Sequence, residues 1–170
     1  MPTTGCHTEA MMRTVAEHLA ACLDIAQAAA PLDVVLLDAV GCVLAEDVVA
    51  DLDLPAVDLA GIDGYAVAVA DLAGASVTSA VTLEVMDAVR AGDMRPTRLV
   101  PGTAILIDSG APLPLGADAV VAWQDTDRGT SRVQVRAQVE AGANVRQRAD
   151  DVRAGETVLT EGTRISARHV

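Results

Sequence analysis

The chain has 170 residues, a formal net charge of −12, and a hydrophobic fraction of 51%. This length suffices for one domain or two small ones with a sizeable core. Phe is absent and there is one Trp and one Tyr, so Val, Leu, Ala and Ile must build that core. The acidic balance, without a basic stripe or an aromatic platform, argues against nucleic-acid binding.

The charge is unevenly divided along the chain. Residues 1–89 carry 14 acidic side chains and one Arg, whereas residues 90–170 carry 10 acidic side chains and 11 Arg. The first half would repel an anionic ligand. We therefore expect such a ligand to lie near the arginines of the second half, or to be held together with a metal ion.

The cysteines favour a reduced, cytoplasmic location. Cys6, Cys22 and Cys42 are odd in number and show no C-x-x-C spacing. His18 and Cys22 are four residues apart and could share a helical face, but Cys22 is more typical of a core residue. No apolar run reaches the ~20 residues that span a bilayer, and the acidic N-terminus does not resemble a signal peptide.

The first regular element expected in the chain is a helix. Residues 1–13 read as a leader, and Thr14-Val-Ala-Glu17 has the spacing of a capping box. An apolar stripe at helical spacing follows, formed by Val15, Leu19, Cys22 and Ala26. The pattern predicts about four turns before Pro31, because a residue that precedes proline is disfavoured in the α region.

After this helix the sequence predicts mainly strands. Val34–Leu37 reads as a short strand. Further strands are expected at Thr82–Met86, Gly102–Ile107, Asp118–Trp123 and Arg132–Val139, separated by Gly and Pro turn signals. We interpret the chain as α+β, with an elongated helix/strand domain (14–50 and 141–170) that carries an inserted small antiparallel β-barrel-like domain (51–140).

A first candidate site lies in the stretch 54–67, where apolar residues surround Asp58 and Asp63. Asp63-Gly64 is a turn dipeptide, since Gly accepts positive φ and Asp can bond to nearby backbone N–H groups. An acidic side chain on a tight turn beside Tyr65 is well placed to face a cleft. The alternative is an ordinary solvated hairpin turn.

A second candidate site is the segment 107–114, where a predicted strand ends in Ser109, Gly110 and a proline-stiffened loop. A hydroxyl together with free backbone N–H groups at a Gly turn can hold an oxyanion or a phosphate. Ser-Gly is also a common turn with no ligand.

A third candidate site is the segment 144–151. In an extended segment Arg146, Arg148 and Asp150 would point to one side and Asp151 to the other. Guanidinium groups can bind phosphate, and carboxylates can hold Mg²⁺. A surface salt-bridge cluster explains the same spacing. The three His residues have no positioned partners in the sequence, and no P-loop or G-x-G-x-x-G motif occurs.

The order of these motifs is more informative than any one of them. An Asp-Gly-Tyr-Ala turn, an Ile-x-Ser-Gly-Ala-Pro-x-Pro loop, an Ala-Asp-Ala-Val-Val strand and an Asn-x-Arg-x-Arg-x-x-Asp segment follow one another. This series resembles the N-terminal part of the molybdopterin molybdotransferases, the MoeA and gephyrin E-domain family, from about Thr14 to Arg164.

The resemblance implies a part in molybdenum-cofactor biosynthesis. Family members are homodimers that insert molybdate into adenylylated molybdopterin with release of AMP, using a divalent cation such as Mg²⁺. This region would contribute dimer contacts and part of the active cleft. The implied catalytic residues are Asp63, Ser109 and Asp151. The expected substrate-binding residues are Asp58, Gly110, Arg146 and Arg148. The expected Mg²⁺ ligands are Asp63 and Asp151.

The sequence also departs from the family pattern. Leu59, Ala60 and Gly61 stand where the family usually has Asn, Ser and Ala, Ser109 replaces Thr, and Ala149 replaces Gly. The family continues into further domains, so we expect either a fragment of a longer enzyme or a short relative without catalysis. The 170 residues alone are not expected to turn over. The alternatives are a non-catalytic scaffold or binding module of the same fold, and a stand-alone oxyanion or Mg²⁺ binder.

Overall fold

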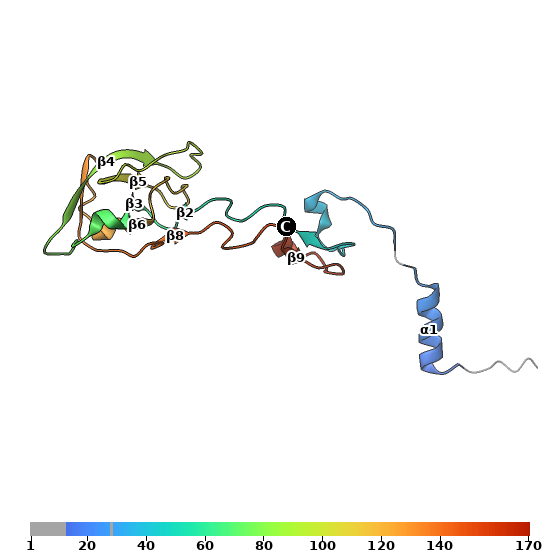
Figure 1. Ribbon diagram of the computed structural model, residues 1–170. Coiled ribbons are helices and arrows are strands. Elements are labelled where there is room, and N and C mark those ends of the chain that lie inside the picture. The colour runs from blue at the N-terminus through green and yellow to red at the C-terminus, as the bar shows by residue number, and fades with distance from the viewer. Residues whose placement is uncertain (1–12, 28) are drawn as a thin grey trace, which may run out of the picture. The chain divides into compact units, whose positions relative to one another are not determined.

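The computed structural model describes residues 13–27 and 29–170, which divide into two units (Figure 1). The larger unit is Glu46–Thr163. The smaller unit comprises the described residues up to Ala45 together with Arg164–Val170. Residues 1–12 of the expected leader lie outside the described residues. The boundaries expected from the sequence, 14–50 with 141–170 and 51–140, stay a prediction.

The smaller unit contains helix α1, Val15–Ile25, which begins with the predicted capping box. The Thr14 N–H donates to Glu17 Oε2 at 2.8 Å, and the Glu17 N–H donates to Thr14 Oγ1 at 3.2 Å. The helix ends six residues before Pro31, so it is shorter than predicted. Cys22 is exposed, and the prediction that it is a core residue is wrong. The apolar stripe predicts the helix, but it does not identify the surface that would bury the apolar face of that helix.

In the rest of the smaller unit, the segment around Gly41 is hydrogen-bonded to the segment around Ile165, which is distant in the sequence. The Gly41 N–H donates to Ile165 O and the Ile165 N–H donates to Cys42 O, both at 2.9 Å. The predicted strand at Val34–Leu37 is wrong, because the chain forms a 3₁₀ helix at Leu36–Ala39 instead. The Asp38 N–H donates to Val35 O, so a local turn takes up the backbone group that a strand ladder would have used.

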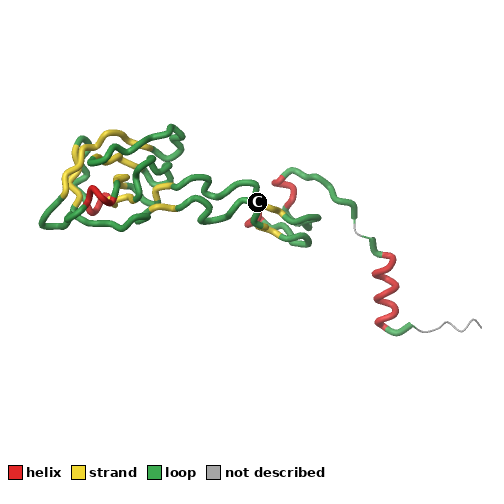
Figure 2. Tube along the Cα trace, in the orientation of Figure 1, coloured by secondary structure: helices red, strands yellow, loops and turns green. Residues whose placement is uncertain are grey.

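A five-stranded sheet forms the centre of the larger unit, drawn in yellow in Figure 2. Its order is β6-β3-β5-β4-β7, with bounds β6 Ala119–Ala122, β3 Gly64–Val67, β5 Thr103–Ile107, β4 Val81–Val89 and β7 Arg132–Val135. Four of these strands were predicted within a few residues. The expectation of a purely antiparallel domain is wrong, since β4 and β5 pair in parallel. A long loop between them replaces a hairpin turn.

The sheet curls because the segment that follows β6 pairs with the edge strand β7. Trp123–Asp125 forms a 3₁₀ helix, after which Thr126 bridges Val135. The Arg136 N–H donates to Asp125 O at 2.8 Å. These contacts connect the segment after edge strand β6 with the opposite edge strand β7, as expected for a barrel-like arrangement.

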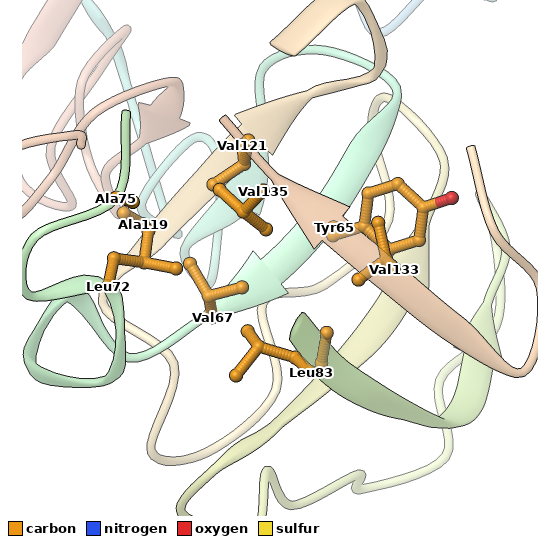
Figure 3. Packing of buried hydrophobic residues seen from close by; sticks show 10 residues of the cluster. Tyr65, Val67, Leu72, Ala75, Leu83, Ala119, Val121, Val133 and Val135 are labelled. Carbon is orange, nitrogen blue, oxygen red and sulfur yellow. The ribbon is translucent and has the colours of Figure 1, made fainter. Parts of the chain in front are cut away.

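Small aliphatic side chains from the sheet pack around Tyr65, as the composition required (Figure 3). The same cluster includes Val67, Leu83, Val121, Val133 and Val135 of the sheet, together with Leu72 of the 3₁₀ helix Val69–Leu72. Tyr65 is 1% exposed and its hydroxyl donates to Gly129 O at 3.1 Å. Burial, with the nearby Asp127 carboxylate, raises the pKa of this phenol. The lone tyrosine is therefore a core residue.

Two short antiparallel pairs complete the larger unit. β1 Val48–Val49 pairs with β9 Thr157–Leu159, and β2 Leu59–Ala60 pairs with β8 Val145–Arg146. A further 3₁₀ helix spans Val69–Leu72. Within the described part of the chain, no helix has the length and apolarity to cross a bilayer.

Candidate functional site

The Ser109 loop is attached to the segment that carries Asp63. Asp63 Oδ1 accepts the Ser109 N–H at 2.7 Å, and the Ser109 hydroxyl donates to Gly61 O at 3.2 Å. The Gly110 N–H donates to Ala60 O at 2.8 Å. The structure thus brings together Asp63, Ser109 and Gly110, three of the residues singled out from the sequence.

These bonds change what the loop can hold. The N–H groups of Ser109 and Gly110 are used by the protein itself, and the Ala111 N–H donates to Asp108 O at 3.0 Å. The expectation of free N–H groups for an oxyanion is therefore wrong for this conformation. A carboxylate beside a hydroxyl suits a cation or a hydrogen-bond donor better than an anion.

Gly64 holds Asp63 in place for a different reason than the sequence suggested. Its φ lies outside the left-handed region, so no positive-φ turn requires glycine there. Gly64 pairs with Ala122 in the sheet, and a Cβ added to it would lie 2.0 Å from Val121 O. Only glycine lets β3 approach β6 this closely. Asp63 therefore stands at the entry to a buried strand.

Asp58 and Arg148 meet in a second cluster, together with Asp53. Asp58 Oδ1 accepts the Arg148 N–H at 2.7 Å, and Asp58 O accepts the Leu113 N–H at 2.9 Å. The Arg148 guanidinium donates to Asp53 Oδ2 at 2.5 Å. Asp58 thereby links the start of β2, the proline loop and the segment after β8. The Arg148 side chain is 66% exposed, so part of it faces solvent.

Asp53 was missed by the sequence reasoning. Its side chain is 15% exposed, and Oδ1 accepts the Ala154 N–H at 2.9 Å. This backbone bond and the Arg148 side-chain bond hold the pKa of the Asp53 carboxyl below its ordinary value. Asp53 and Arg148 are 95 residues apart, so no spacing rule could have paired them.

We expect Asp53→Asn to destabilise the chain in a pH-dependent way. Because the pKa of Asp53 is lowered in the folded state, its stabilising effect is complete above the unfolded-state pKa and is lost as pH falls through the folded value. The stability difference between the two proteins should be constant above about pH 5 and shrink below about pH 4. Urea unfolding at several pH values measures it. If the stability difference between the wild type and Asp53→Asn persists unchanged in acid, the lowered pKa assigned to Asp53 is contradicted.

Arg146 and Asp151 form a third pair. Arg146 donates to Asp151 Oδ2 at 2.5 Å, and both side chains are at least half exposed. Such a surface pair contributes about 0–1 kcal/mol. Asp150 instead accepts the Gln147 N–H at 2.9 Å. The expected alternation of 146, 148 and 150 on one side is wrong, because the chain turns at Ala149 rather than staying extended.

Ala149 has a φ of 63°, the left-handed conformation that glycine adopts without strain. We expect Ala149→Gly to raise the free energy of unfolding by about 0.5–1 kcal/mol, measured by urea unfolding. The matched control is Ala154→Gly at a residue without positive φ, where added flexibility should lower stability by about 0.4–1 kcal/mol. Loss of stability in both variants would show that Ala149 is not strained.

The oxygen donors of the site are of the kind that Mg²⁺ prefers. Within residues 13–27 and 29–170, no three His, Cys, Asp or Glu side chains gather as a metal site. Mg²⁺ is often held by only one or two carboxylates, with waters and substrate phosphates as further ligands. Asp63 and Asp151 each fit that limited role. Their protein partners differ, since Asp63 binds Ser109 and Asp151 binds Arg146.

Residues 13–170 match the family model described as the MoeA N-terminal region (domain I and II). The chain belongs to this family. The match includes every candidate residue named above.

The curated relatives include two mycobacterial enzymes. Molybdopterin molybdenumtransferase 2 of Mycobacterium tuberculosis is 42% identical over 151 residues, covering 89% of this chain and 37% of the relative. Molybdopterin molybdenumtransferase 1 of the same organism is 39% identical, covering 94% and 41%. The chain thus spans about two fifths of the length of these relatives.

A solved structure shares the fold. The crystal structure of the molybdopterin biosynthesis MoeA protein from Pyrococcus horikoshii OT3 superposes with a TM-score of 0.75 at 36% identity. The match covers 79% of this chain and 36% of that protein. The resemblance inferred from the motif order is therefore confirmed.

Proposed function

We propose that the chain is the N-terminal region of an enzyme that inserts molybdate into adenylylated molybdopterin, with release of AMP. Family membership and the names of the relatives support a role in molybdenum-cofactor biosynthesis. The observation that carries the proposal is the hydrogen bond between Asp63 and the Ser109 N–H, which joins two of the motifs that resemble the family at one place in the fold.

The proposed roles follow from the contacts of each residue. Asp63, positioned by the Ser109 N–H, would present a carboxylate to the proposed active cleft, and the Ser109 hydroxyl, which now donates to Gly61 O, would offer a hydrogen bond. Asp151, held by Arg146, is the second carboxylate. Mg²⁺, when bound to these carboxylates, would neutralise phosphate oxygens of the substrate.

The remaining proposed roles concern substrate binding. Arg146 and Arg148 would supply positive charge from their exposed guanidinium groups. Asp58 and Gly110 would shape the two segments that face the substrate, since each bonds across to the other chain segment.

We propose that the protein acts as a cytoplasmic homodimer. Apolar side chains on α1 support the dimer, because Val15 is 88% exposed and Leu23 is 64% exposed. We also propose that the β-rich region is an insertion into an elongated first domain, with the boundaries 51–140 and 14–50 with 141–170.

The proposal is tested on the polypeptide as its source cell makes it. The purified protein is supplied with adenylylated molybdopterin, molybdate and Mg²⁺, and AMP release is followed. We expect AMP release that depends on molybdate. The 170 residues alone should release none. A native polypeptide that binds molybdopterin but never transfers molybdenum would contradict the proposal.

A non-catalytic scaffold is the second candidate function. Ala60 is fully buried and Leu59 is half-buried, where the family usually has polar Ser and Asn. Two polar groups are thereby lost beside Asp58. Titration calorimetry of the native polypeptide that detects neither pterin nor molybdate binding would favour the scaffold over the enzyme.

A further inference from the structure

Helix α1 carries a histidine and a cysteine that the proposed function leaves unused. His18 and Cys22 are four residues apart, which puts their side chains on one face of the helix. His18 Nε2 lies 3.8 Å from Cys22 Sγ, and both residues are exposed. The sequence favoured a core position for Cys22 over a metal-binding role. Because Cys22 is not in the core, that explanation no longer accounts for it.

The separation of the two atoms suits two ligands of one zinc ion. Zinc binds a cysteine thiolate at about 2.3 Å and a histidine nitrogen at about 2.0–2.1 Å, with tetrahedral geometry in structural sites. Two such ligand atoms therefore lie about 3.5–3.6 Å apart. A small rotation of the His18 ring, whose terminal torsion is soft, brings the observed 3.8 Å to this value. The pair is half of a tetrahedral site.

The charge of α1 favours a cation at this place. The helix contains Glu17 and Asp24 but no Lys or Arg. Cys22 lies in the last turn, where the carbonyl end of the helix dipole attracts positive charge. Nitrogen and sulfur ligands suit zinc, whereas Mg²⁺ takes oxygen ligands. This pair therefore suits a different metal from the one that carboxylates prefer.

The described part of one chain does not complete the site. Among residues 13–27 and 29–170, no third His, Cys, Asp or Glu side chain joins the pair. A second copy of α1 supplies the same two ligands, and a two-fold axis through the metal arranges the two pairs as a tetrahedron. Apolar side chains give the two helices further surface to bury, since Val15 is 88% exposed and Leu19 is 57% exposed.

We propose that a Zn²⁺ ion is bound between two copies of the chain by His18 and Cys22 of each copy, and that it joins the two α1 helices. The inference rests on the homodimer in the proposed function and is independent of the molybdate chemistry. The role of the ion is structural, because the protein fills all four coordination positions and leaves none for a substrate.

Metal titration of the native polypeptide tests the stoichiometry. The protein is stripped with a chelator, kept reduced with a reductant that is not a thiol, and titrated with Zn²⁺ and separately with Co²⁺. We expect saturation at one metal per two chains, with the strong visible absorption of tetrahedral Co²⁺ and a thiolate-to-metal charge-transfer band. Saturation at one metal per chain, a weakly absorbing octahedral Co²⁺ spectrum, or no binding would overturn the proposal.

Variants at the pair locate the metal. Cys22→Ser and His18→Gln each remove two of the four ligands in the dimer. Each should weaken Zn²⁺ binding at least about 100-fold, because even a change to the partner of a ligand costs about 10–100-fold. The matched control is Cys42→Ser, at an exposed cysteine outside α1, which should bind like the wild type. All three positions are exposed, so the fold is kept. Unchanged Zn²⁺ affinity in Cys22→Ser or in His18→Gln would overturn the assignment.

Sedimentation equilibrium tests the bridge between the copies. Removal of Zn²⁺ should raise the dissociation constant of the wild-type dimer at least about tenfold, and Zn²⁺ should restore the wild type but not Cys22→Ser. A dimer whose dissociation constant does not respond to metal would overturn the inference. A zinc-bridged dimer without molybdate-dependent AMP release would count against the proposed enzyme alone, and an active dimer that binds no Zn²⁺ would count against this inference alone.

Discussion

Gly64→Ala should lower the free energy of unfolding by about 3 kcal/mol. The added methyl would lie 2.0 Å from Val121 O, which belongs to the backbone of β6 and cannot rotate away. Relief requires β3 and β6 to separate, and this breaks their pairing from Gly64–Ala122 to Val67–Ala119. Urea unfolding, followed by the fluorescence of Trp123, measures the loss.

Gly61→Ala is the control for this change. It adds the same methyl three residues earlier, where the nearest atom is Asn144 O at 3.1 Å. A small shift accommodates that contact, so we expect a loss within about 1 kcal/mol. Equal stability of the two variants would show that close approach at Gly64 does not constrain the sheet.

Asp63→Asn in the native polypeptide should reduce molybdate-dependent AMP release by about 100-fold. Asparagine Oδ1 can accept the Ser109 N–H that Asp63 now accepts at 2.7 Å, so the loop stays attached. The variant removes the negative charge proposed to meet the metal or the substrate. The initial rate of AMP release under saturating substrate measures the effect.

Asp71→Asn provides a matched comparison. Asp71 Oδ2 accepts the Gly102 N–H at 2.7 Å, which is the same kind of bond at the same length elsewhere in the unit. This variant should keep the wild-type rate. A similar fall in both variants would indicate a structural effect, and a normal rate for Asp63→Asn would remove Asp63 from the chemistry.

Local patterns predicted the local features of the fold well. The capping box at Thr14 and Glu17 depends on residues three apart, and both of its bonds are present. A strand was expected at Arg132–Val139, and in the observed strand β7 Val133 and Val135 are fully buried. Such signals depend only on neighbours along the chain.

Features that depend on distant segments could not be predicted. The parallel pairing of β4 with β5 depends on the path of a long loop. The need for glycine at Gly64 comes from Val121, and the partner of Arg148 is Asp53. The motif order predicted the family, and thereby the residues of the candidate site. It could not show that Asp63 uses the Ser109 N–H, because only the folded loop reveals which amides remain free.

The pairing of β1 with β9 has a consequence for synthesis on the ribosome. Val48 and Val49 leave the ribosome long before their partners Leu159 and Thr157. At about 5–20 residues per second the delay is about 5–20 seconds. During that time the first strand of the larger unit has no native partner. The five-stranded sheet can form earlier, since all its strands precede β9, but the β1–β9 pair can form only late in translation.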